Sequence, residues 1–105
     1  MNGNDFRRQL DLLFTDISEA IEESEASFLV SVSEWQIKIA RGDSQVVIKA
    51  HSDPQLLILE YPQIEPCKFE CFDGEWLCID TEKPLIPILG EVLRELNGAE
   101  FAVYL

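Results

Sequence analysis

The sequence has few basic residues, and they are missing altogether from one long stretch. Twenty Asp and Glu residues stand against eight Lys and Arg, which gives a formal net charge of −12 over 105 residues. No Lys or Arg occurs between Arg8 and Lys38. Nucleic acids and anionic membranes would repel such a chain, so we expect neither as a partner. The charge favours cations or a basic protein surface, although acidic residues also serve solubility alone.

Long apolar runs and a cysteine framework are also missing. No run reaches the roughly 18 apolar residues that a membrane span needs. The N-terminal residues show neither a secretory apolar core nor the composition of an organellar transit peptide. Three cysteines are an odd number and suggest no disulfide framework, so we expect a reducing, cytoplasmic location. A chain of this length with 47% hydrophobic residues is expected to form one domain, residues 1–105.

The first part of the chain has the pattern of one amphipathic helix, from residue 4 to about residue 25. Asn4 or Asn2 could cap its start, since an Asn side chain accepts a hydrogen bond from the first helical turn. Apolar residues recur at spacings of three and four, which places them on a single stripe. The stripe consists of Phe6, Leu10, Leu13, Phe14, Ile17 and Ile21.

From Phe28 onward the apolar period changes to two, which is typical of β-strands. Asp73-Gly74 predicts a tight hairpin between the last two of six short runs. Short connections between the runs predict an antiparallel sheet. A second helix is predicted over residues 84–97, with Pro84 in its first turn and an extended segment after it. The six runs are FLVSVSE, WQIKIAR, SQVVIKA, LLILEY, CKFECF and EWLCID.

This order of elements predicts an α+β fold. Two helices that flank a run of antiparallel strands can bury their apolar stripes only against the sheet. We therefore expect a two-layer α/β sandwich, with two helices packed on one face of a five- to six-stranded antiparallel sheet.

The acidic residues of the first helix fall together on the side opposite the apolar stripe when placed at 100° per residue. Only Arg8 and an exposed Leu12 interrupt this arc. Carboxylates three or four positions apart repel each other by roughly 0.2–0.5 kcal/mol per pair. The helix dipole also opposes acidic residues near the C-terminal end. A solvated helix face is one interpretation, and a site that keeps a negative field for a cation or a basic partner is the other. The arc contains Asp5, Asp11, Asp16, Glu19, Glu22 and Glu23.

Carboxylate oxygens are hard ligands that suit Mg²⁺, Ca²⁺, Mn²⁺ or iron better than a closed zinc site. An open helix face supplies few ligands for each ion, and water must complete the coordination. The pattern therefore predicts weak ion binding at a surface and no catalytic metal centre.

The residues that could support an enzyme are few. His51, the only histidine, borders a turn and is interpreted as a surface residue. Cys67 and Cys71 would lie about 13 Å apart on one strand, too far to share a metal ion. Counting across the hairpin places Cys71 opposite Trp76 and Phe69 opposite Cys78, so the thiols are interpreted as core packing. A tight cluster of the three cysteines could form only at the Cys71/Cys78 diagonal. No phosphate loop or nucleophile elbow occurs, and we expect no enzymatic activity.

The order of acidic helix, antiparallel sheet and short C-terminal helix resembles the frataxin family, especially its bacterial members, over nearly the whole chain. The likeness is closest in the first 25 residues, MNGNDFRRQLDLLFTDISEAIEESE. The segment GDSQVVIKAHSDP is similar to the family's Gly-containing turn, aliphatic strand and Pro. The segment KFECFDGEWLCID is similar to its aromatic strand and W-x-C-D-like segment, carried here by Trp76 and Cys78.

The resemblance implies a small acidic protein that binds ferrous and ferric iron weakly on its first helix and first strand edge. It also implies docking on the cysteine desulfurase and scaffold of iron–sulfur cluster assembly, and a monomer in the absence of iron. Glu34 is a weaker addition to the site. Carried over by position, the iron and desulfurase ridge would comprise Asp11, Asp16, Glu19, Glu22, Glu23 and Glu25.

Two segments depart from the family: QIEP replaces the Gly-Gly that precedes its aromatic strand, and the exposed sheet face differs. Frataxins carry Gln-x-Trp on the exposed sheet face, where the scaffold is contacted, whereas this chain has Leu56 and Ile58 in PQLLILEY. The two residues are either an apolar patch for a different partner or core residues, and the core interpretation is preferred. The partner surface would then comprise Glu19, Glu22 and Glu23, with Leu56 and Ile58 added if they are exposed. The alternative function is an acidic protein-interaction or chaperone-like module with no metal role.

Overall fold

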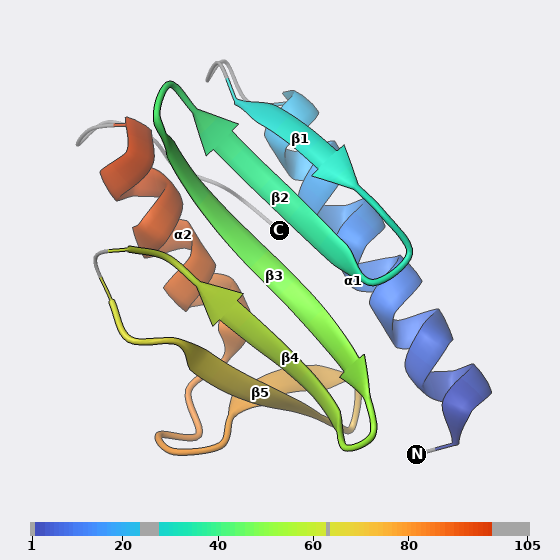
Figure 1. Ribbon diagram of the computed structural model, residues 1–105. Coiled ribbons are helices and arrows are strands. Elements are labelled where there is room, and N and C mark those ends of the chain that lie inside the picture. Colours follow the sequence, from blue (N-terminus) through green and yellow to red (C-terminus); the bar gives the residue numbers. More distant parts are fainter. Residues whose placement is uncertain (1, 24–27, 63, 98–105) are drawn as a thin grey trace.

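The structure is a computed structural model that describes residues 2–23, 28–62 and 64–97. Both helices lie on one face of a six-stranded sheet (Figure 1). The predicted α+β two-layer sandwich is confirmed. In chain order the elements are α1 (Gly3–Glu23), β1 (Leu29–Val32), β2 (Gln36–Arg41), β3 (Ser44–Ser52), β4 (Gln55–Glu60), β5 (Cys67–Phe72), β6 (Glu75–Cys78) and α2 (Leu85–Asn97).

Helix α1 begins where the sequence predicts. The backbone N–H of Asp5 donates a hydrogen bond to Oδ1 of Asn2 at 2.8 Å, so Asn2 is the N-cap. All six apolar residues of the predicted stripe are buried. The predicted extension of the helix to about residue 25 lies outside the described residues.

The sheet is antiparallel throughout, and its strands lie side by side in chain order from β1 to β6. Asp73 and Gly74 have φ angles of 54° and 84°, which the tight turn of the β5–β6 hairpin requires. The register of this hairpin is the predicted one, with Phe69 opposite Cys78 and Cys71 opposite Trp76.

Alternate residues of the strands face the helices, because successive side chains point to opposite sides of a sheet. The inward residues pack with α1 and α2 into one cluster of buried side chains. Each large apolar side chain in it contributes roughly 1.5–3 kcal/mol. The best-buried strand residues are Ile37, Ile39, Ile48, Leu57, Leu59 and Phe69.

Helix α2 starts one residue later than predicted. Pro84 forms an isolated antiparallel bridge with Leu77 of β6, and the helix begins at Leu85. The placement of Pro84 in the first helical turn is therefore wrong by one residue, and Pro87 occupies that turn instead. The extended segment predicted after this helix lies outside the described residues. Neither α1 nor α2, as described, is long and apolar enough to cross a bilayer.

Candidate functional site

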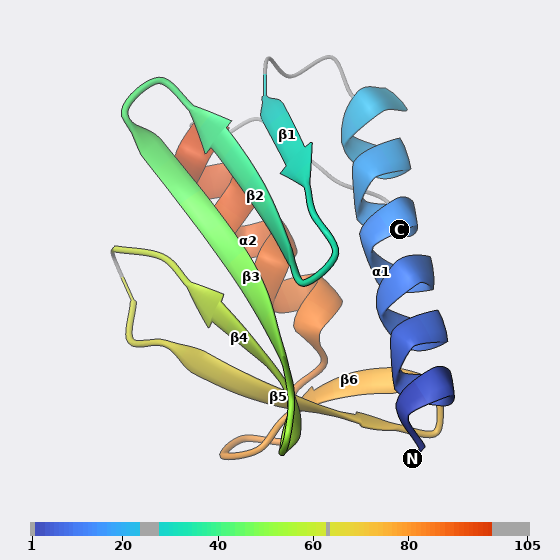
Figure 2. The ribbon, with the colours of Figure 1, turned by 45° about the vertical axis from the view of Figure 1, so that its right-hand side comes forward.

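The candidate site is the side of α1 that faces away from the sheet (Figure 2). The buried stripe fixes the rotation of the helix, so the carboxylates on the opposite side point to solvent. We call four of them, all exposed, the acidic face. Within the described residues, no ion pair joins any of the four to a basic side chain. The acidic face consists of Asp16, Glu19, Glu22 and Glu23.

Asp11 was predicted to belong to the same ridge, but the structure places it in a different environment. Its Oδ1 accepts hydrogen bonds from Nε and Nη2 of Arg7 at 3.1 and 2.7 Å. The guanidinium of Arg7 also lies over the ring of Trp35, 5.0 Å from its centroid, and donates to the backbone carbonyl of Glu34. Asp11 is therefore part of a contact that ties α1 to the β1–β2 turn, and its charge is compensated.

Sequence reasoning missed the role of Arg7. The signal was present, because Arg7 and Asp11 stand four residues apart and such positions are neighbours on a helix surface. Arg8 and Asp5 form a second pair of this kind, with Nη2 and Oδ1 2.7 Å apart. The contact with Trp35 comes from a residue far along the chain and has no local sequence signature.

The remaining predicted ligands are placed as follows. Glu34 is exposed beside the β1–β2 turn, and Glu25 lies outside the described residues. Among the residues that the structure describes, no three His, Cys, Asp or Glu side chains come together in a group that could hold a metal ion. The donor chemistry of the acidic face thus suits a hard cation, but no three donors among the described residues converge on one ion.

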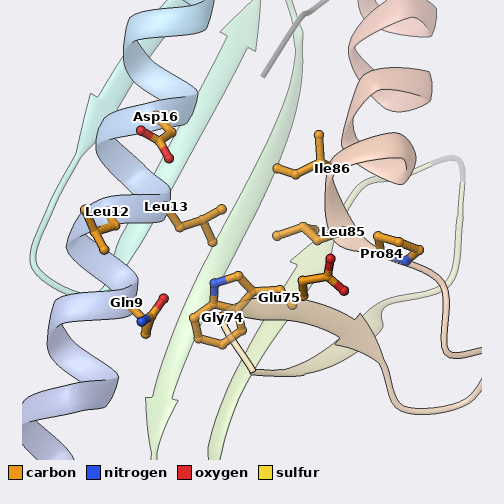
Figure 3. A pocket seen from close by; sticks show the side chains of 10 residues that line it. Gln9, Leu12, Leu13, Asp16, Gly74, Glu75, Pro84, Leu85 and Ile86 are labelled. Carbon is orange, nitrogen blue, oxygen red and sulfur yellow. The ribbon is translucent and has the colours of Figure 1, made fainter. Parts of the chain in front are cut away.

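A groove adjoins the acidic face between α1, β6 and the start of α2 (Figure 3). Asp16 lines it from the helix side and Glu75 from the strand side. Its base includes Trp76, whose ring packs edge-on against Phe6 with centroids 5.8 Å apart. Leu12, the apolar interruption of the acidic arc, also lines the groove and is 53% exposed. The sequence pattern located Leu12 but not the groove.

Leu56 and Ile58 lie on the sheet face away from the helices. Their neighbours Leu57 and Leu59 are fully buried, whereas both are half-buried and outside the core cluster. The preferred core interpretation is therefore wrong for these two residues. Ile58 stands between two lysines, Lys49 on β3 and Lys68 on β5. The side chains of Leu56 and Ile58 can contact a partner, and the charges around them are mixed, since Lys49 pairs with Glu60 at 3.4 Å.

The three cysteines face the core. Cys78 is buried, and Cys67 and Cys71 are half-buried and packed against the core cluster, as predicted. Burial raises the pKa of the Cys67 and Cys71 thiols. A hydrogen bond involving the Thr81 side chain lowers the pKa of Cys78, but that residue is buried in the core. His51 is exposed on β3, as predicted.

Comparisons with known proteins agree with this architecture at the level of the fold. No protein-family model matches the chain, and no curated protein matches its sequence significantly. Among solved structures, it is similar to a frataxin of the CyaY protein family from Psychromonas ingrahamii, with a TM-score of 0.89 and 17% sequence identity. The match covers 98% of this chain and 96% of that one. The chain therefore has the frataxin fold, which the sequence resemblance predicted.

Proposed function

We propose that this protein is a frataxin-like regulator of iron–sulfur cluster assembly, which binds iron weakly on the acidic face of α1 and docks there on a cysteine desulfurase. The observation that carries the proposal is the uncompensated charge of that face on a frataxin fold. In this role the protein modulates the chemistry of a partner and needs no catalytic centre of its own.

The electrostatics of α1 favour a positively charged ligand. Asp16/Glu19, Glu19/Glu22 and Glu19/Glu23 are like-charge pairs on one helix surface, each unfavourable by roughly 0.2–0.5 kcal/mol. No basic residue occurs in the last turn of α1 to balance the helix dipole. A bound cation or a basic protein surface would relieve both costs, so binding is coupled to the release of repulsion.

The ligand chemistry supports iron as a loosely held cargo. Carboxylate oxygens are suitable for Fe²⁺ and Fe³⁺, as for other hard cations. Because no three donors converge within the described part of the chain, each ion would receive one or two protein ligands and otherwise water. Such an ion exchanges readily, which suits a protein that supplies iron or senses it.

The partner surfaces follow from the same charges. A basic patch on the desulfurase would meet Glu19, Glu22 and Glu23, and that contact should weaken with salt. A different partner would meet the outer sheet face at Leu56 and Ile58, because the Gln-x-Trp with which frataxins contact the scaffold is missing there. Two lysines flank Ile58 on that surface, but Lys49 is paired with Glu60, so charge contributes less there than on the acidic face. The two partners can therefore bind the same molecule at the same time on different sides.

Titration with Fe²⁺ tests the proposal. In the wild type, NMR signals of α1 should broaden first, and a Glu19/Glu22/Glu23→Gln variant should lose most of that effect. The matched control is Glu65/Glu70/Glu91→Gln, which removes three exposed carboxylates outside α1. The same three proteins should be compared for desulfurase binding at low and high salt. Equal binding by all three, with no effect of salt, would remove the acidic face from the function.

A second candidate is an acidic protein-interaction or chaperone-like module with no metal role. The observation that favours it is that no three metal donors converge among the described residues. This candidate requires partner binding that is unaffected by iron and is dominated by the sheet surface. A Leu56/Ile58→Ser variant would then lose partner binding, whereas the glutamine triple variant would keep it.

A further inference from the structure

The groove beside Leu12 has the size and lining of a side-chain pocket. Its volume is about 460 Å³, within the roughly 300–1,000 Å³ of typical ligand sites. The base is apolar and tightly packed, since Leu13, Trp76 and Leu85 are 7%, 6% and 1% exposed. Figure 3 shows Leu13 of α1 and Leu85 of α2 pointing toward each other across the groove. Leu12 and Trp76 also line it. An apolar side chain placed there would chiefly cover the exposed part of Leu12, since the base is already almost fully buried.

The charged groups at the groove are all of one sign. Asp16 and Glu75 line it from two different elements, and Gln9 adds an amide. Among the described residues that line the groove, none is basic. Neither carboxylate forms an ion pair within the described part of the chain. The groove is thus an apolar pocket with an acidic rim, continuous with the acidic face through Asp16.

We propose that this groove anchors one large apolar side chain of a basic protein segment, whose flanking Lys or Arg residues meet Asp16 and Glu75. The inference rests on the proposed function, because it takes the partner of the acidic face to be basic. It also gives Leu12 a role. A leucine that interrupts an acidic arc weakens a purely electrostatic contact, but beside an apolar pocket it extends the surface that the anchor covers.

The acidic face and the groove would contribute to binding in different ways. Exposed charges mainly accelerate encounter and fix orientation, and their contribution is screened by salt. A buried aromatic or aliphatic anchor contributes affinity that salt does not weaken. A partner that uses both should therefore keep part of its affinity at high ionic strength, which a partner bound by the acidic face alone would lose.

Two short peptides test the proposal on the full-length, ¹⁵N-labelled protein. The probe is N-acetyl-Arg-Trp-Arg-amide, and the matched control is N-acetyl-Arg-Ser-Arg-amide, which has the same charge without the anchor. We expect the probe to shift the amide signals of Leu12, Gly74 and Ile86 and the indole N–H signal of Trp76. The control should shift only the acidic face and bind at least fivefold more weakly. In 0.5 M salt the probe should still bind, and the control should not.

Three variants assign the contact to the groove. Leu12→Ala should weaken probe binding about fivefold, since it removes apolar area from the lip. Asp16→Asn combined with Glu75→Gln should weaken it about threefold at low salt. Glu70→Gln, which removes one carboxylate on the outer sheet face, should leave probe affinity unchanged. Leu12, Asp16 and Glu75 are exposed, so spectra away from the groove should show the fold intact.

Two results would overturn the proposal. If the probe binds no more tightly than the control, or shifts no groove signal, the groove is not an anchor site. Binding of the control to the acidic face would in that case leave the proposed function standing. A shortened chain that ends at Asn97 and binds the probe much more tightly would assign the groove to residues 98–105 of the same chain.

Discussion

The two halves of α1 treat their carboxylates in opposite ways. In the first half, Asp5 and Asp11 each pair with an arginine of the same helix at 2.7 Å. In the second half, the acidic face has no basic partner among the described residues. Both halves bury the same apolar stripe. The difference shows that acidity alone does not mark a site, because the negative field remains available only where the structure leaves it uncompensated.

The largest expected effect tests whether the two halves rest on one core. Leu10→Ala in the first half and Ile17→Ala in the second should each lower the free energy of unfolding by about 2–5 kcal/mol, since both side chains are almost fully buried. Urea denaturation measures this. Leu12→Ala, at an exposed position between them, is the control and should change stability by less than about 0.5 kcal/mol. A large loss in only one half would mean that the helix is not held as one unit.

A smaller loss of stability is expected when an ion pair in the first half of α1 is removed, so that its carboxylate is left uncompensated as in the second half. Arg7→Met should lower the free energy of unfolding by about 1–2 kcal/mol, because it removes the ion pair with Asp11 and the contact with Trp35. It should also extend Fe²⁺-induced broadening to Asp11, whose carboxylate becomes free. Arg8→Met is the control, because its pair with Asp5 is more exposed and should contribute less. Unchanged iron binding near Asp11 in Arg7→Met would contradict the role given to compensation.

Neutralising the glutamates of the acidic face should stabilise the protein, whereas Arg7→Met should destabilise it. Glu19/Glu22/Glu23→Gln should raise the free energy of unfolding by about 0.5–1 kcal/mol at low salt, because it removes three like-charge pairs. The gain should shrink at 0.5 M salt, where exposed charges are screened. Asp5/Asp11→Asn should instead destabilise the protein slightly. Denaturation curves at both salt concentrations measure these changes in the free energy of unfolding. A destabilised triple variant would show that these glutamates stabilise the fold.

The smallest effect should come from a cation that stands in for iron. Mg²⁺ at a concentration equal to its dissociation constant should stabilise the wild type by about 0.4 kcal/mol. The Asp5/Asp11→Asn variant should respond like the wild type, and the glutamine triple variant should not respond. Thermal unfolding with and without Mg²⁺ measures the difference. Equal stabilisation of all three proteins would place cation binding outside the acidic face.

The sequence predicted the fold well because its signals are local. The apolar stripe of α1, the alternation in the strands and the Asp73-Gly74 turn each depend on residues close together in the chain, and all three are confirmed. The error at Pro84 arose because a bridge to Leu77, from another element, set where α2 begins.

The candidate site was predicted less completely, because its properties depend on contacts between distant elements. Helical spacing located the carboxylates. It could not show that Arg7, held against Trp35, forms an ion pair with Asp11 and compensates its charge. The alternation along β4 placed Leu56 and Ile58 on one face of the sheet and Leu57 and Leu59 on the other. The pattern alone could not show which of the two faces the helices cover. The groove is lined by residues of α1, β6 and α2, so the sequence of no single segment could predict it.

The uncompensated half of α1 should be the half that attracts cations. Residue-by-residue NMR broadening of the wild-type protein during a titration with Fe²⁺ tests it most directly, since both halves are observed in one sample. The signals of the acidic face, Asp16, Glu19, Glu22 and Glu23, should broaden at lower Fe²⁺ concentrations than those of Asp5 and Asp11. Broadening that begins equally in both halves, or that begins on the sheet, would contradict it.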